Sequence, residues 1–168
     1  MTSFSFERCD RFVIGTVGMP GEREFYLQIT QDDRHTSFAM EKGQASALSE
    51  RMRQLLKELR RRNVTSAGLM SKENVDDDPL TMPVDSEFPL GDMSLIWVEE
   101  SEMIVFEASS ADQNVPGTLA VSLSVSQANE FIRRTDKVVS AGRAPCPFCG
   151  LPLNVDGHLC PRANGYRR

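Results

Sequence analysis

The sequence contains no long hydrophobic run. No apolar stretch approaches the roughly 20 residues that a membrane-spanning helix needs. The segment from Met1 to Arg11 holds four charged side chains and no apolar run, so we expect no secretory signal. These absences predict a cytoplasmic protein without a membrane partner.

Histidine and cysteine are scarce, with two histidines and four cysteines among 168 residues. Disulfides rarely persist in a reducing cytoplasm, so clustered cysteines there more often bind a metal or do redox work. Cys9 stands alone, and we interpret it as an isolated, buried thiol. We interpret His35, at the start of a predicted strand, as a sheet-edge residue and not as a general base. No set of residues matches a catalytic signature, so the protein is not expected to be an enzyme.

Positive charge is scarce outside the C-terminal tail. The chain has 19 basic and 24 acidic residues, a net charge of −5. Residues 143–168 hold four arginines and one aspartate, which gives +3 and leaves −8 for the rest of the chain. A nucleic-acid-binding body needs a dense cationic face, so we do not expect nucleic acid to be the main partner.

Two parts of the sequence repeat one order of patterns, in which strand-like alternation is followed by a helical period. The predicted strands are 11–18, 24–30 and 35–41 in the first part, and 93–99, 102–109 and 118–125 in the second. Gln44-Ala45 aligns without a gap with Gln127-Ala128, 83 positions later, and the apolar positions of both predicted amphipathic helices follow. The alternative is a chance likeness between two strand-to-helix junctions.

We predict an α+β fold for residues 1–140, namely a pseudo-duplicated βββα–βββα antiparallel sheet with two amphipathic helices. The half-repeats span about 8–62 and 92–140. Whether they form one sheet or two stays open. The acidic, proline-containing linker 63–91 includes Asp76-Asp77-Asp78, which we interpret as a solvated loop and not as a cation site.

Cysteine and histidine cluster in the tail, residues 143–168. Cys146 and Cys149 are two residues apart, as in a zinc knuckle, and His158 and Cys160 complete a tetrahedral Cys₃His set. Because protein side chains fill all four positions, we expect a structural Zn²⁺ and a short C-terminal zinc knuckle. The redox alternative needs a helix directly after Cys149, but Gly150 and Pro152 follow.

The last seven residues are basic and contain an aromatic ring. Arg162, Tyr166, Arg167 and Arg168 either belong to a frayed chain end or bind an acidic or phosphate-bearing partner. We keep both interpretations open.

Several motifs give the chain a family resemblance. They are Asp10-Arg11-Phe12-Val13, Gly15-Thr16-Val17-Gly18 with Pro20-Gly21-Glu22-Arg23, and above all CPFCGLPL and DGHLCPRANGYRR. With these motifs the chain resembles an actinobacterial family of uncharacterised proteins, known as a domain of unknown function, over nearly its whole length. Family members often carry Asp-Pro where this chain has Asn154-Val155, which leaves the predicted ligands untouched. The resemblance implies a cytosolic protein and assigns no activity.

Three function hypotheses follow. The first is a non-enzymatic interaction or regulatory module with a structural zinc site and a protein partner. The second is a small-ligand binder or an enzyme with a pocket between the half-repeats, for which residues 15–23 (GTVGMPGER) form a candidate loop, although a β-hairpin turn explains their glycines more simply. The third is weak nucleic-acid binding through the basic tail.

Overall fold

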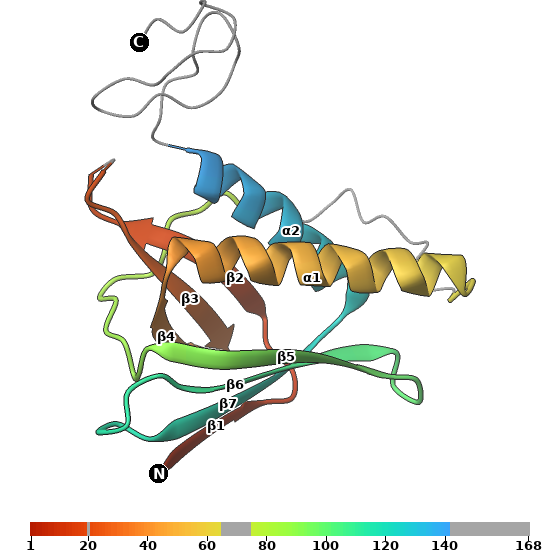
Figure 1. Ribbon diagram of the computed structural model, residues 1–168, viewed down its shortest axis with the longest axis horizontal. Coiled ribbons are helices and arrows are strands. Elements are labelled where there is room, and N and C mark those ends of the chain that lie inside the picture. The colour runs from red at the N-terminus through yellow and green to blue at the C-terminus, as the bar shows by residue number, and fades with distance from the viewer. Residues whose placement is uncertain (20, 65–74, 142–168) are drawn as a thin grey trace, which may run out of the picture.

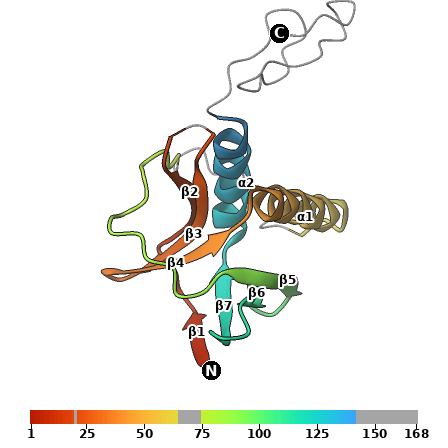
Figure 2. The same ribbon diagram turned by 60° about the vertical axis from the view of Figure 1, so that its left-hand side comes forward.

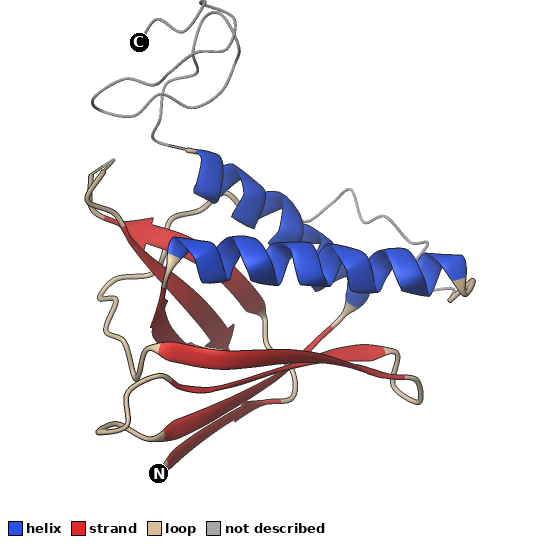
Figure 3. Cartoon of the chain, in the orientation of Figure 1, coloured by secondary structure: helices blue, strands red, loops and turns tan. Residues whose placement is uncertain are grey.

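The computed structural model describes residues 1–19, 21–64 and 75–141. These residues form two β-sheets and two α-helices, which confirms the predicted α+β class (Figure 3). The predicted zinc knuckle, within residues 143–168, lies outside the described residues. Among the described helices, none combines the length and the apolar character needed to cross a membrane.

The smaller sheet has three antiparallel strands, β2 (Arg11–Val17), β3 (Glu24–Gln31) and β4 (Arg34–Met40), in the order β2-β3-β4. All three match predicted strands. The β2–β3 connection is a hairpin in which Gly18 has φ 109°, a conformation that favours glycine. The hairpin interpretation of the glycine-containing segment is therefore confirmed.

The larger sheet has four strands in the order β1-β7-β6-β5. The predicted strands correspond to β5 (Leu90–Val98), β6 (Met103–Ser110) and β7 (Gly117–Leu123), which pair antiparallel. The sequence interpretation missed β1 (Thr2–Phe6), which pairs with β7 in parallel. The expectation of purely antiparallel pairing was therefore wrong at this edge, and the open question of one sheet or two is answered by two.

The two helices, α1 (Lys42–Arg61) and α2 (Val125–Ser140), follow the last strand of each half and pack on each other. Ser49 donates a hydrogen bond to the Asp136 carboxylate at 2.8 Å, and Arg53 forms an ion pair with the same carboxylate. In Figure 1, α1 and α2 cross above the four-stranded sheet. In Figure 2, the three-stranded sheet, α2 and α1 follow one another from left to right.

A single core joins the two halves. The Phe12 ring of β2 packs against Phe106 of β6 and Phe131 of α2, with ring centroids 5.5 and 5.1 Å apart. Phe38 of β4, which is fully buried, packs against Phe4 of β1 at 5.4 Å. Aromatic rings from both sheets thus bury each other's apolar surface, at about 25 cal/mol for each Å² removed from water.

The segment just before each half pairs with the last strand of the other half. Ser5 of β1 pairs in parallel with Ala120 of β7, and Ser86 forms a parallel bridge with Ser37 of β4. Ser5 and Ser86 lie 81 positions apart, whereas Ser37 and Ala120 lie 83 apart. The same pairing therefore occurs at corresponding positions of both sheets.

A second contact recurs at the start of each helix. Gln44 and Gln127 each accept the backbone N–H of the helix N-cap, at 2.8 and 2.9 Å, which closes a capping box. The Gln44 amide donates to the Leu90 carbonyl at 2.8 Å, and the Gln127 amide donates to the Cys9 carbonyl at 2.7 Å. Leu90 and Cys9 again lie 81 positions apart. Leu90 begins β5, and Cys9 lies just before β2.

Candidate functional site

The predicted metal ligands are not among the described residues. Cys146, Cys149, His158 and Cys160 all lie in 142–168, and so do the predicted partner-binding residues, which are Arg162, Tyr166, Arg167 and Arg168. In residues 1–19, 21–64 and 75–141, no group of three or more His, Cys, Asp or Glu side chains could hold a metal.

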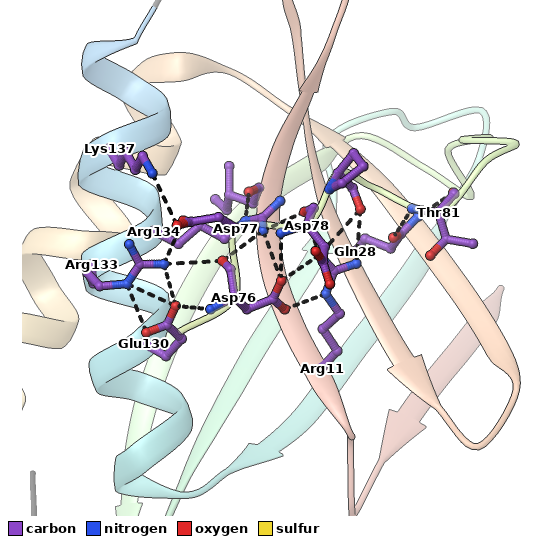
Figure 4. A network of polar contacts seen from close by, with 12 residues as sticks. Arg11, Gln28, Asp76, Asp77, Asp78, Thr81, Glu130, Arg133, Arg134 and Lys137 are labelled. Carbon is purple, nitrogen blue, oxygen red and sulfur yellow. Dashed lines mark hydrogen bonds and ion pairs between the residues drawn. The ribbon is translucent and has the colours of Figure 1, made fainter. Parts of the chain in front are cut away.

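A cluster of polar side chains joins the linker to β2 and α2 (Figure 4). Arg11 of β2 donates two hydrogen bonds to the Asp76 carboxylate, at 2.6 and 3.0 Å, in the forked geometry that guanidinium groups make with carboxylates. Burial would raise the pKa of Asp76, but the hydrogen bonds and charge of Arg11, the Asp78 backbone N–H and the charge of Arg134 together outweigh burial and hold that pKa below its usual value.

Arg134 of α2 is the buried centre of this cluster, with 5% of its surface exposed. Its Nε donates to the Ile14 carbonyl at 2.8 Å, and its Nη1 donates to the carbonyls of Asp76 at 3.0 Å and Asp78 at 2.7 Å. Burial lowers the pKa of the Arg134 guanidinium. This one side chain therefore links α2, the edge strand β2 and the linker.

A more exposed set of ion pairs flanks Arg134. Arg133 and Lys137 both pair with Asp77, at 2.8 and 3.2 Å, and Arg133 also pairs with Glu130 at 2.6 Å. Glu130 accepts the Asp76 backbone N–H at 2.8 Å. Asp77 and Asp78 are exposed, as expected of a solvated loop, whereas Asp76 is half-buried, and cationic side chains of β2 and α2 pair with Asp76 and Asp77.

The linker continues across the outer face of the three-stranded sheet. Gln28, fully buried on β3, exchanges two hydrogen bonds with the Thr81 backbone, at 3.0 and 2.9 Å. Leu80 packs on Gly15, where an added Cβ would lie 2.4 Å from the leucine Cγ. The segment therefore follows a fixed course and is part of the packed structure.

Two hollows lie between the halves. One, of about 420 Å³, lies between the start of α2 and β2, and it is bordered by Val75–Asp78 of the linker. The other, of about 500 Å³, lies between the first half of α1 and β5. No described segment lies across the second hollow as the linker lies along the first.

Neither Cys9 nor His35, the two residues considered individually in the sequence, lies in an environment that indicates a chemical role. Cys9 is a buried free thiol that contacts the Ser122 carbonyl at 3.7 Å, and burial raises its pKa to about 11, as expected for an unreactive thiol. His35 is exposed near the start of β4, where its Nδ1 lies 2.9 Å from the Thr30 hydroxyl. The sequence interpretation overlooked Arg134, since a single arginine beside an apolar helix face carries no local motif.

The family comparison covers most of the chain. The model of a family described as "Protein of unknown function (DUF3090)" matches residues 4–160, and the chain belongs to this family. The matched range includes the described residues from Phe4 onward and the positions of all four predicted zinc ligands. No curated protein and no solved structure matches the chain.

Proposed function

We propose that this member of the family is a cytoplasmic, non-enzymatic interaction module whose tail is folded by one structural Zn²⁺. The observation that carries the proposal is the ligand spacing, Cys146-x₂-Cys149 followed by His158-x-Cys160. Three thiolates and one imidazole match the tetrahedral ligand set of structural zinc sites. With four protein ligands the ion has no open position for a substrate, which favours a structural role.

The body supports this role by holding the helix from which the tail departs. Arg134 ties α2 to β2 and to the linker. Near the end of α2, Arg23 donates to the Val138 carbonyl at 3.1 Å. The chain beyond residue 141 therefore starts from a helix fixed at both its centre and its end. We propose that Arg162, Tyr166, Arg167 and Arg168 then bind an acidic or phosphate-bearing partner protein.

We further propose that the body is an internal duplication with exchanged first strands. Two observations support it: the matching parallel pairs Ser5–Ala120 and Ser86–Ser37, and the matching glutamine contacts at the two helix starts. All of them have the same two displacements, 81 positions for the residues that precede or begin each half and 83 for the last strand and the helix.

The zinc site is tested by native mass spectrometry of the full chain purified from its own host. We expect one zinc ion per chain, lost in Cys146→Ser and retained in the matched control Cys9→Ser, because Cys9 is buried in the core. Zinc retained by Cys146→Ser, or absent from the unaltered chain, would contradict the proposed ligand set.

The partner is tested by affinity purification from the same host. We expect one partner protein, recovered in a fixed ratio, that is lost when Arg162, Arg167 and Arg168 are replaced by serine. The control is Arg34→Ser, which removes an exposed arginine from the body. Equal recovery of the same partner by the serine variant would exclude the tail as the binding surface.

A further inference from the structure

The two hollows between the halves lie at corresponding positions, and among the described residues only the first is bordered by the linker. In the first, the backbone of the linker is bonded to Glu130 and Arg134 of α2, and Arg134 also bonds to the edge strand β2. The second, which we call the α1–β5 groove, is lined by Gln44, Ala47, Leu48, Arg51, Met93 and Leu95 among others.

The displacements of the proposed repeat relate the two sets of lining residues, since Gln44 and Ala47 correspond to Gln127 and Glu130. Beside the first hollow, Arg134 corresponds to Arg51, and Ile14, whose carbonyl accepts from Arg134, corresponds to Leu95. Arg51 makes no hydrogen bond or ion pair within the described part of the chain. Because β5, like β2, is the edge strand of its sheet, the groove combines an open strand edge with an arginine placed to bind backbone carbonyls.

Two charged positions at or near the α1–β5 groove are reversed with respect to its counterpart, whereas Arg51 and Arg134 carry the same charge. Asp92 stands at the position of Arg11, which binds the Asp76 carboxylate, and it makes no ion pair with a described residue. Glu50, which pairs with Arg53, stands at the position of Arg133. At the lining position of Arg11 and Asp92, the first groove therefore suits an acidic side chain, and the α1–β5 groove suits a basic one.

We propose that the α1–β5 groove binds the chain's own C-terminal segment, within residues 142–168. In the repeat, this segment follows α2 as the linker follows α1. The linker reaches its groove at Asp76, 15 residues after Arg61, and 28 residues follow Ser140, so length is sufficient at about 3.3 Å per extended residue. The segment carries +3 against −8 on the rest of the chain.

The inference rests on the proposed function and adds regulation to it. Arginines bound beside Asp92 are not available to an acidic partner protein. The groove and the partner therefore compete for the tail, and partner binding requires its release.

The test is photo-cross-linking in the full chain with p-benzoylphenylalanine at position 47. Ala47 is exposed, lines the groove and corresponds to Glu130, which contacts the linker. Irradiation followed by proteolysis and mass spectrometry should give intramolecular cross-links to peptides of residues 142–168. The control places the same group at Ser46, which is exposed on the same helical turn but does not line the groove.

A charge reversal tests the electrostatic part of the inference. Asp92→Arg should lower the cross-link yield from position 47 about fivefold, the scale of one surface charge pair. Asp33→Arg makes the same change of net charge on an exposed turn and should leave the yield unchanged. Cross-links from position 47 to a second copy of the chain, or none to residues 142–168, would overturn the docking inference.

Zinc is measured in the same samples, so that the two proposals fail separately. A zinc-loaded chain without cross-links refutes docking and leaves the zinc proposal intact. Cross-links in a chain without zinc support docking and refute the zinc proposal.

Discussion

Replacing Arg134 by alanine should destabilise the protein by about 3–4 kcal/mol. The buried guanidinium donates to three backbone carbonyls, of Ile14, Asp76 and Asp78. Hydrogen bonds to charged groups contribute roughly 1.5–3 kcal/mol each, and removing one partner of a buried pair costs about 3–5 kcal/mol. We expect the lower part of that range because Asp76 keeps its two hydrogen bonds from Arg11.

The neighbouring Arg133 provides the matched control. Its side chain is 36% exposed, and ion pairs with that exposure contribute about 1 kcal/mol or less, so Arg133→Ala should have a small effect. Arg134→Lys should lie between the two, because an ammonium group cannot reproduce the guanidinium fork. Urea unfolding followed by circular dichroism and Trp97 fluorescence measures all three variants. Equal losses for Arg134→Ala and Arg133→Ala would refute the assignment of Arg134 as the anchor.

Three further outcomes are expected. Gly15→Ala should lower the free energy of unfolding in urea by about 1–3 kcal/mol, because the added Cβ collides with Leu80. The control Gly43→Ala, where the added Cβ meets no atom within 4 Å, should be neutral or stabilising by up to about 1 kcal/mol. Equal effects of the two variants would contradict the packing of Leu80 on Gly15. Cys9 in the folded protein should be alkylated at pH 8 at least about 100-fold more slowly than in urea, because its pKa is raised from 9.0 to about 11. The contribution of this thiol to stability should be lost as pH rises from about 9 to 11. Fast labelling of the folded protein would exclude a buried thiol. The Asp76 carboxylate, whose pKa is lowered in the folded state, should stabilise the protein fully above about pH 5 and progressively less as pH falls below the ordinary aspartate pKa of about 3.9. In Asp76→Asn, the free energy of unfolding should therefore fall less steeply with acid. An unchanged dependence of that free energy on pH would count against the Arg11 pair.

Six of the seven strands in the described part of the chain could be predicted from the sequence because their side chains alternate between core and solvent. The alignment of the two helices in the sequence also predicted where each helix starts, since Gln44 and Gln127 occupy the same capping position. β1 was missed although Phe4 and Phe6 alternate with serines, because a five-residue strand beside charged residues gives a weak signal. Its parallel partner, β7, begins at residue 117, and such distant pairing leaves no local pattern.

The arginine cluster could not be predicted for a related reason. Asp76 and Asp77 form a charged run, and such runs are usually solvated. What fixes them are Arg11, 65 positions earlier, and Arg133 and Arg134, more than 50 positions later. Local composition reports the charge of a segment, but only the folded chain brings its counter-charges together.

The place of β1 has a practical consequence for handling the protein. β1 covers one edge of β7, a strand of mostly apolar and small residues, and it contributes Phe4 and Phe6 to the core. Proteolytic trimming of the first six residues would leave a row of unpaired backbone N–H and C=O groups along β7. Bare edges of this kind recruit strands from other chains. Loss of these few N-terminal residues would thus turn a self-contained fold into one prone to aggregation.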